Sequence, residues 1–272
     1  MPREGHFSFM NEIPIADIRS LAEAADATQL AALERSLQGD ARKGVAAILK
    51  RAHARLDACK AEADRLDGIY VFQESLAQDA GARCVVGVDE VGRGPLAGPL
   101  AVGAVVLPPA PKVAGLNDSK QVKECDRAAI AAEVKRVALA WSVQYVQPPQ
   151  IDELGIMKSL RLAFTEAVRA VEAQGAAVDM ILLDGNPMHL DPRETNVVKG
   201  DSKCASIAAA SILAKVARDE LMDELDAKHP GYDLASNKGY GTQAHRDAIR
   251  RLGLSDIHRR SYCGEFLQES LF

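Results

Sequence analysis

The stretch that decides the fold is Cys84-Val-Val-Gly-Val-Asp-Glu-Val-Gly-Arg-Gly94, in which an apolar run ends on two adjacent acids and a glycine-rich turn. The run is rich in β-branched residues, so the pattern predicts a buried strand with acids at its end. A second apolar run at residues 100–107 predicts a neighbouring strand. Adjacent acids at such a strand end repel each other unless a cation compensates. The stretch is therefore the first candidate for a functional site.

Working outward from this stretch, strands and helices follow in an order that indicates a mixed sheet. Residues 141–146 alternate polar and apolar side chains, residues 180–183 form another short apolar run, and a short strand is predicted around residues 196–199. Helices are predicted over residues 160–173 and 202–225. The first half of the second helix is small and apolar nearly all round, so it should be buried against the sheet. Strands followed by a strand-helix-strand unit are typical of an α/β domain.

The first 80 residues differ from the rest in texture. Between Ala16 and Leu66 there are only two glycines and no proline, which is helical composition. From Val45 to Tyr70, apolar residues recur at steps of three and four, the period of one helix face. We therefore predict an N-terminal helical extension over residues 1–80 and a catalytic domain over residues 81–272 with a C-terminal helical region. The extension is interpreted either as an appendage packed on the main domain or as a substrate or partner contact.

The composition is that of an ordinary globular protein, with 47% hydrophobic and 26% charged residues in a chain of 272. No apolar run approaches the roughly 20 residues of a membrane span, and the first residues lack the core of a signal peptide. We therefore expect a cytoplasmic protein. The five cysteines are widely spread and form no C-x-x-C pair, which predicts free thiols rather than disulfides or a zinc site.

Charge is distributed unevenly along the chain. The net charge of −5 counts mildly against binding of nucleic acid by bulk electrostatics. Residues 238–260, however, contain six Lys or Arg residues against two acids. We call residues 238–260 the basic stretch. It is interpreted either as a surface where a phosphate backbone docks or as a solvated helix face.

Acids stand at the ends of three predicted elements, and they suggest metal-assisted hydrolysis. Cleaving a phosphodiester needs an activated water and a stabilised leaving oxygen, and two divalent cations about 3.5 to 4 Å apart can supply both. Mg²⁺ prefers carboxylates and water as ligands. Taken singly, each acid could be a turn or N-cap residue. Because ligands gather at the carboxyl ends of parallel strands, we expect these acids to form one cluster: Asp89, Glu90, Asp184 and Asp201.

Residues 87–99 resemble the opening motif of the bacterial type 2 ribonucleases H, usually called ribonuclease HII. The resemblance continues in order to about residue 262. The similar blocks are Leu116-Asn-Asp-Ser-Lys, Leu182-Leu-Asp-Gly-Asn, Lys199-Gly-Asp-Ser-Lys, Ser206-Ile-Ala-Ala-Ala-Ser-Ile-Leu-Ala-Lys-Val-Ala-Arg-Asp, Asn237-Lys-Gly-Tyr-Gly-Thr and His258-Arg-Arg-Ser-Tyr. The tail after Arg260 departs from the usual family pattern.

The resemblance implies a ribonuclease H-like fold, in which helices flank a mixed five-stranded sheet. It implies an endonuclease that hydrolyses the RNA strand of RNA/DNA hybrids and nicks 5′ of a single ribonucleotide embedded in duplex DNA, leaving 3′-hydroxyl and 5′-phosphate ends. The family's catalytic carboxylates, which bind Mg²⁺ or Mn²⁺, correspond to Asp89, Glu90, Asp184 and Asp201. The family also suggests a monomer.

The resemblance also implies substrate-binding residues. The turn Gly92-Arg93-Gly94 would read the 2′-hydroxyl, the atom by which a protein distinguishes RNA from DNA. Tyr240 would pack on the sugar next to the ribonucleotide and favour a junction to DNA, and Lys120 would contact a backbone phosphate. Ser202 and Lys203 are weaker candidates, because a helix start explains them equally well.

Two other readings remain open. Another nuclease of ribonuclease H-like fold, such as a 3′-5′ exonuclease or a transposase, would also gather acids on a similar sheet, but the Asp-Glu pair followed by Gly-Arg-Gly disfavours it. A non-catalytic duplex-binding protein would need the basic stretch and not the acids. The presence of all four acids argues against that class.

Overall fold

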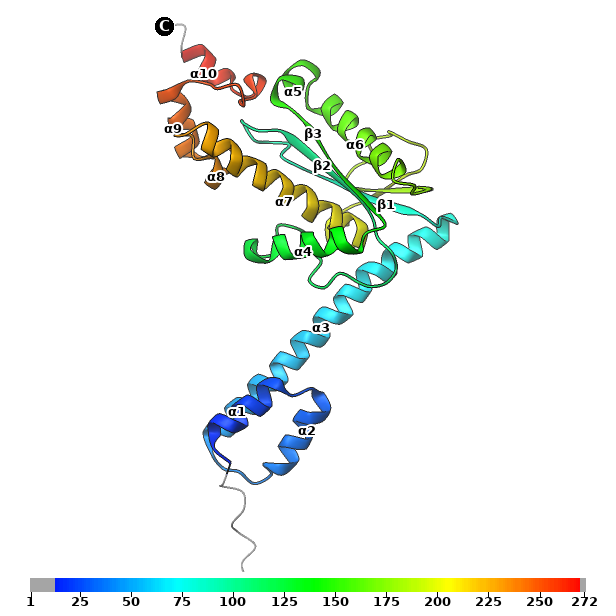
Figure 1. The fold of residues 1–272 in the computed structure, drawn as a ribbon, viewed down its shortest axis with the longest axis vertical. Helices are drawn as coiled ribbons and strands as arrows, with labels where there is room; N and C mark the ends of the chain where they lie inside the picture. Colours follow the sequence, from blue (N-terminus) through cyan, green and yellow to red (C-terminus); the bar gives the residue numbers. More distant parts are fainter. Residues whose placement is uncertain (1–12, 270–272) are drawn as a thin grey trace, which may run out of the picture. The chain divides into compact units, whose positions relative to one another are not determined.

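The structure is a computed structural model that describes residues 13–269. By its internal contacts the chain divides between Arg65 and Leu66 into two compact units. The first unit contains helices α1 (Ile15–Ala24), α2 (Ala27–Ser36) and the first part of α3 (Lys43–Ala80) (Figure 1). Its core includes buried apolar side chains from all three helices: Ile18, Ala22, Leu30, Val45 and Ile48. The helical character predicted for this part of the chain is thus confirmed.

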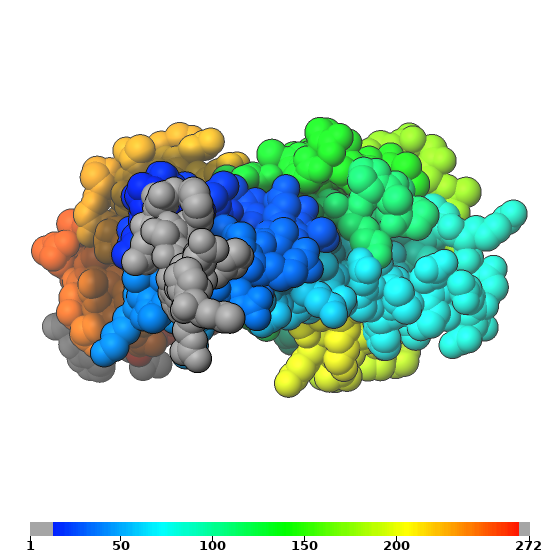
Figure 2. All heavy atoms as spheres, turned by 90° about the horizontal axis from the view of Figure 1, so that it is seen from below, coloured from blue at the N-terminus to red at the C-terminus, as the bar shows by residue number. Residues whose placement is uncertain are grey.

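Helix α3 continues into the second unit, where its last turns pack on the catalytic half of the chain. Ile69 and Tyr70 are buried there, and the Tyr70 hydroxyl accepts a hydrogen bond of 3.1 Å from the Val113 N–H. Figure 2 shows the cyan atoms of this part of α3 against green atoms of the following segments. The contact-based division therefore falls before residue 66 and not at residue 80. The predicted functional domains, residues 1–80 and 81–272, stay a prediction.

The second unit is built on a five-stranded mixed sheet, as the resemblance implied. Its strands are β1 (Val85–Val91), β2 (Leu100–Val106), β3 (Ala140–Val146), β4 (Met180–Asp184) and β5 (Glu194–Val197). They lie in the order β3-β2-β1-β4-β5, and β1 is antiparallel to β2 but parallel to β4. Strand β4 in turn is parallel to β5. The carboxyl ends of these three parallel strands therefore share one edge of the sheet.

Helices cover both faces of the sheet (Figure 1). Helix α6 (Ile156–Glu172) packs on one face, where its Phe164 meets Val88 and Val102 in a single buried cluster. Helices α7 (Ala205–Lys228) and α4 (Glu124–Val137) contribute to the cluster on the other face. We call these the α6 face and the α7 face. Since side chains alternate along a strand, each strand of the sheet serves both faces.

Helix α7 lies unusually close to the sheet, and small residues make this possible. A Cβ atom placed on Gly87 of β1 would stand 2.2 Å from the carbonyl carbon of Ser206 in α7. The first half of α7 supplies alanines at the contact, including Ala208 and Ala209, which are fully buried. The predicted burial of this helix is confirmed, and its first turns are fixed tightly beside the ends of β1 and β4.

The remaining helices follow the sheet or close the C-terminal region. Pro148 and Pro149 follow strand β3 and begin helix α5 (Pro148–Leu154), at positions where proline is favoured. Helix α4 was not predicted. The C-terminal helical region comprises α8 (Leu234–Asn237), α9 (Gln243–Leu252) and α10 (Gly264–Glu269). All five cysteines are free thiols, as expected. None of the helices in residues 13–269 has the length and apolar character needed to cross a membrane.

Candidate active site

Asp89 and Asp184 come together because they occupy equivalent places on neighbouring parallel strands. Val88 of β1 pairs with Leu183 of β4, so the next residue on each strand is an aspartate. Alternation from Gly87, which meets α7, directs the Asp89 side chain to the α7 face. The repulsion between the two carboxylates is one cause of the raised pKa of Asp89. The parallel register thus places two of the four predicted acids, Asp89 and Asp184, at the same edge of the sheet.

Asp89 is the most deeply enclosed of these acids, with 6% of its surface exposed. Its Oδ1 accepts a hydrogen bond of 2.8 Å from the Glu90 N–H, and Ser211 of α7 also bonds to its carboxyl group. Burial, followed by the charges of Glu90 and Asp184, raises the pKa of Asp89 to about 8. A carboxylate in this environment is stabilised by a nearby positive charge.

Asp201 joins the cluster from the turn that precedes α7. It lies in a 3-10 turn, η1 (Gly200–Ser202), and is 7% exposed. Burial and the neighbouring charges of Asp184 and Asp118 raise the pKa of its carboxyl group. The N-cap of α7 is Cys204, so Asp201 is not the helix cap that its position in the sequence allowed. The Gly200 N–H donates to Oδ1 of Asp184 at 2.6 Å and ties this turn to the end of β4.

Lys120 brings a positive charge to the edge of the cluster. Its Nζ lies 3.6 Å from Oδ2 of Asp201 and 3.8 Å from Oδ1 of Asp118, while 78% of its side chain remains exposed. Burial acts to lower the pKa of Lys120, but the charges of Asp118 and Asp201 outweigh it and raise the pKa. The side chain can therefore stay near the acids and still reach a ligand in solvent.

Glu90 is directed differently from Asp89 because it is the next residue along the strand. Its Oε1 lies 3.8 Å from Nη1 of Arg93. Burial raises the pKa of Glu90, although the charge of Arg93 opposes this shift. Within the acidic cluster, Glu90 is thus the member that lies next to the Gly92-Arg93-Gly94 turn.

The turn that follows β1 is held by two arginines that have no exposed surface, Arg218 and Arg259. Gly92 has a φ of +84°, and a Cβ atom there would lie 2.3 Å from Nε of Arg218. Arg259 donates to the carbonyl oxygen of Gly92 at 2.6 Å and to that of Arg93 at 3.1 Å. Apart from the two chain neighbours of Gly94, none of the described residues has an atom within 4 Å of a Cβ built on that glycine. The turn is therefore fixed on the side of Gly92 by Arg218 and Arg259, and it is open on the side of Gly94.

Tyr240 lies in the loop between α8 and α9, with 44% of its surface exposed. This loop is hydrogen-bonded to the segment that follows the Gly92-Arg93-Gly94 turn: the Leu96 N–H donates to the Gly239 carbonyl oxygen at 2.8 Å. Arg218 bonds to both segments, to Pro99 O at 2.9 Å and to Lys238 O at 2.9 Å. Two stretches 140 residues apart in the sequence are in this way brought side by side.

Comparison with known proteins shows which family the sequence matches. A family model described as "Ribonuclease HII" matches residues 86–265. Another, described as "Ribonuclease HII N-terminal domain", matches residues 14–77. Ribonuclease HII of Moorella thermoacetica is 48% identical over 202 residues, which make up 74% of this chain and 96% of that protein. The chain belongs to the ribonuclease HII family. The family predicted from the sequence blocks is thus confirmed.

Solved structures show the same fold at lower identity. Ribonuclease H2 from Pyrococcus horikoshii OT3 has a TM-score of 0.59 and 24% identity, covering 69% of this chain and 98% of its own. Bst-RNase HIII, solved in complex with Mn²⁺, has a TM-score of 0.54 and 22% identity, covering 68% of this chain and 69% of its own. These likenesses confirm the ribonuclease H-like fold of this ribonuclease HII.

The basic stretch of this ribonuclease HII is less available for phosphate than its charge count suggested. Arg259 is buried and bonds to backbone carbonyls. Three others form ion pairs with acids from nearby elements: Lys238 with Asp223, Arg246 with Glu265, and Arg250 with Asp247. Four of the six basic side chains in residues 238–260 are therefore buried or paired with acids. This disfavours the interpretation of the basic stretch as a broad phosphate-docking surface.

The acidic cluster of ribonuclease HII fits a hard cation by the chemistry of its donors. Carboxylate oxygens are the ligands that Mg²⁺ and Mn²⁺ prefer. Within residues 13–269, no three His, Cys, Asp or Glu side chains are arranged to hold a metal ion as they stand. One oxygen of Asp184 is engaged by the Gly200 N–H, and Lys120 approaches Asp201. The fit therefore rests on the donor types and on the burial of Asp89 beside like charges.

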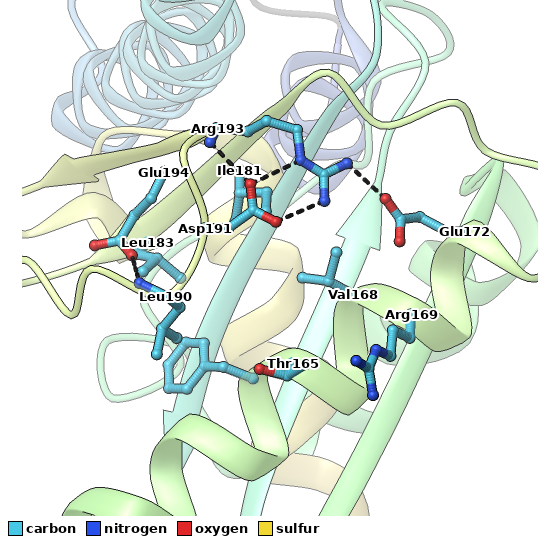
Figure 3. A pocket seen from close by; sticks show the side chains of 11 residues that line it. Thr165, Val168, Arg169, Glu172, Ile181, Leu183, Leu190, Asp191, Arg193 and Glu194 are labelled. Atoms are coloured by element: carbon cyan, nitrogen blue, oxygen red, sulfur yellow. Dashed lines mark hydrogen bonds and ion pairs between the residues drawn. The ribbon is translucent and has the colours of Figure 1, made fainter.

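A separate hollow of about 230 Å³ lies on the α6 face (Figure 3). Its charged side chains are already paired: Arg193 bonds to Asp191 at 2.8 Å and to Glu172 at 2.6 Å. Glu194 accepts three backbone N–H bonds from residues 188–190. Asp89 points to the other face, so this hollow is not part of the acidic cluster of ribonuclease HII.

Sequence reasoning did not single out Arg218, Arg259 or Asp118. All three lie within the blocks that resemble the family, but no function was predicted for any of them. Charge alone would have placed both arginines on the surface, because buried unpaired arginines are rare. Only the fold reveals that they bond to carbonyl oxygens of the two loops.

Proposed function

We propose that this ribonuclease HII uses Asp89, Glu90, Asp184 and Asp201 to hydrolyse the RNA strand of RNA/DNA hybrids and to nick 5′ of single ribonucleotides embedded in duplex DNA. The observation that carries this proposal is the parallel register that sets Asp89 beside Asp184, with Asp201 tied to the same strand end. The products would be 3′-hydroxyl and 5′-phosphate ends. We also propose that the enzyme acts in the cytoplasm as a monomer.

The four carboxylates would hold the divalent cations, Mg²⁺ or Mn²⁺. Bound there, the cations would supply a water of lowered pKa and offset the charge of the leaving oxygen. Asp89 is the best anchor, because its carboxyl group is oriented by the Glu90 N–H and by Ser211. Mn²⁺ occurs in the structure of Bst-RNase HIII, which shares the fold.

Substrate recognition would fall to the residues around the cluster. Gly94 leaves space in front of the turn, so a sugar or phosphate could approach the backbone closely. Arg93, with 56% of its side chain exposed, could donate to oxygens of the same nucleotide. Lys120 would contact a phosphate, and Tyr240 would pack on the adjoining sugar.

The deciding experiment compares matched duplexes that carry one ribonucleotide, four ribonucleotides or none, incubated with the full chain and Mg²⁺ or Mn²⁺. We expect nicks 5′ of the single ribonucleotide, cuts within the run of four, and no cutting of the all-DNA duplex. Equal cutting of the all-DNA duplex would contradict the proposed specificity. Binding of all three duplexes without cutting would favour a non-catalytic duplex-binding role.

A further inference from the structure

Two histidines behind the Tyr240 loop have no part in the proposed chemistry, although both are enclosed by the fold. His245 of α9 is 0% exposed and His258 is 2% exposed. Their Nε2 atoms lie 3.2 Å apart, and Nδ1 of His245 lies 3.0 Å from the carbonyl oxygen of Tyr240. At the far end of the pair, the Ser255 N–H lies 3.1 Å from Nδ1 of His258. The two rings thus connect Ser255 to Tyr240.

The contacts determine which ring nitrogens carry protons. The backbone N–H of Ser255 can only donate, so Nδ1 of His258 accepts and the proton of that ring is on Nε2. This Nε2–H donates to Nε2 of His245, whose own proton is therefore on Nδ1. Nδ1–H of His245 then donates to the carbonyl oxygen of Tyr240. Every ring nitrogen is satisfied, and both rings are neutral.

His258 is itself fixed to the segment that follows the Gly92-Arg93-Gly94 turn. Its backbone forms an isolated antiparallel bridge with Ala97. On either side, the Gly98 N–H donates to Ile257 O at 2.9 Å and the Arg259 N–H donates to Leu96 O at 2.8 Å. The histidine pair therefore links the backbone behind the turn to the backbone of Tyr240.

We propose that His245 and His258 are positioning residues, which hold the Tyr240 loop in register with the turn and thereby set the preference for a ribonucleotide embedded in DNA over a continuous hybrid. The inference rests on the proposed function, because Tyr240 would contact the sugar beside the ribonucleotide. Neither histidine touches the substrate. They act through the carbonyl oxygen of Tyr240, which leaves the aromatic ring exposed and oriented.

A third proton on the pair would break the chain of bonds. A proton added to Nε2 of His245 would meet the Nε2–H of His258, so that two donors oppose each other. A proton added to Nδ1 of His258 would oppose the Ser255 N–H in the same way. Burial lowers the pKa of both rings, that of His258 to about 4. The charged or titratable groups that act on the pair are His229, Asp233 and Asp256, and the ring of Tyr232 packs against both histidines.

Two substitutions at residue 245 separate the bonds that His245 makes. The amide nitrogen of asparagine lies as many bonds from Cα as Nδ1 of histidine does, so His245→Asn can still donate to Tyr240. Glutamine places its amide at the distance of Nε2, so His245→Gln can still bond to His258 but not to Tyr240. His229→Gln is the matched control, since His229 is paired with Asp256 and not with Tyr240.

The readout is the ratio of kcat/KM on a duplex with one embedded ribonucleotide to kcat/KM on a continuous hybrid. For His245→Gln we expect this ratio to fall about fivefold to tenfold, the effect of one lost hydrogen bond. His245→Asn and His229→Gln should keep it within about twofold. In a Tyr240→Ala background, His245→Gln should change the ratio no further, because the residue through which it acts is gone.

A second measurement uses the unaltered enzyme. Between pH 6 and pH 4 the ratio should decline, because the pKa of His258 is about 4 and protonation of the pair releases Tyr240, while effects on the shared chemistry cancel in the ratio. Folded variants that all keep the wild-type ratio would overturn the proposal, as would a ratio constant with pH. If the unaltered enzyme cuts neither duplex, the proposed function itself fails. If it cuts both and the ratio never moves, only the positioning role fails.

Discussion

Gly92 and Gly94 flank one arginine in the same turn, yet the protein packs against only the first of them. Replacing Gly92 by alanine forces a φ of +84° on a residue with a Cβ and drives that atom into Arg218. We expect Gly92→Ala to lower the free energy of unfolding by at least about 2 kcal/mol. Gly94→Ala should change it by less than about 0.5 kcal/mol. Urea unfolding of the two variants measures both effects.

The same pair separates packing from substrate contact. If a nucleotide approaches the Gly94 backbone closely, Gly94→Ala should raise KM about tenfold while stability is retained. A Gly94→Ala enzyme with unchanged KM would show that the space in front of the turn is not used.

Asp184 allows a direct test of the acidic cluster. Because loss of a residue that merely supports a metal ligand costs about 10- to 100-fold in activity, we expect Asp184→Asn to lower kcat by more than about 100-fold. Duplex binding should persist, since Arg93 and Lys120, the side chains proposed to contact the substrate backbone, are unchanged. The matched control is Asp179→Asn, at a residue that lies just before the opposite end of β4 and whose carboxylate accepts from the N–H groups of residues 83 and 84. An Asp184→Asn variant with full activity would disprove the assignment of this residue.

At this scale the sequence indicates which acids belong together but not how they are supported. Asp89 and Asp184 were predictable because each follows a recognisable apolar strand, and strand ends on one edge of a sheet converge. The bonds of Arg259 and His245 could not be predicted, because they depend on loops that meet only in three dimensions.

At the scale of elements, truncating the chain within or after helix α3 is the most informative experiment. Beyond Leu66 it buries Ile69 and Tyr70 and bonds through Gln73 to the Ser206 N–H at 2.7 Å, at the start of α7. Deleting residues 1–65 leaves these contacts intact, whereas deleting residues 1–80 removes them. Since burying each large apolar side chain contributes about 1.5 to 3 kcal/mol, the longer deletion should cost about 5 kcal/mol, comparable with the stability of many domains.

Thermal unfolding of the two truncated chains tests this expectation. The chain that begins at residue 66 should melt cooperatively, and the chain that begins at residue 81 should melt at a much lower temperature or fail to fold. Equal melting temperatures would show that the last turns of α3 contribute little, and that the predicted boundary at residue 80 is also a folding boundary.

The elements themselves were predictable where periodicity is strong and not where it is weak. Strands β1 to β4 and helices α6 and α7 follow from apolar runs and small-residue content. Helix α4 was missed because its buried residues, Ala131, Val134 and Val137, are few among charged neighbours. Strand β5 was expected around residues 196–199 but spans Glu194–Val197, a displacement typical of a short strand with mixed composition.

At the scale of the whole molecule, the buried histidines make stability depend on pH. Burial, and then the neighbouring His245, lower the pKa of His258 from 6.5 to about 4. Between these values the unfolded chain binds a proton that the folded chain excludes, so stability falls as the pH falls. The contribution is complete above about pH 6.5, and about 3 kcal/mol of it is lost by pH 4.

This contribution must be isolated from that of Asp89, whose raised pKa acts in the opposite direction over the whole of this range. We therefore expect the difference in free energy of unfolding between the unaltered protein and His258→Gln to shrink steadily from pH 7 to pH 4. Urea titrations at several pH values measure it. A difference that is constant over this range would mean that His258 is not excluded from protonation by the fold.

The ion pairs within the basic stretch also determine how the enzyme should respond to salt. Each phosphate neutralised by a protein cation releases condensed counterions, and the affinity for B-DNA then varies with salt with a log-log slope of about −0.9 per phosphate. Lys238, Arg246 and Arg250 are paired with acids, and Arg259 is buried. This leaves the charges of Arg260 and of Arg251, which donates to the carbonyl oxygen of Gly231 at 3.4 Å. The stretch should therefore contribute a slope of about −2 rather than about −5. Over a fourfold rise in salt the stretch would then account for a loss of about 16-fold in duplex affinity, whereas six unpaired cations would account for a loss of about 1,000-fold.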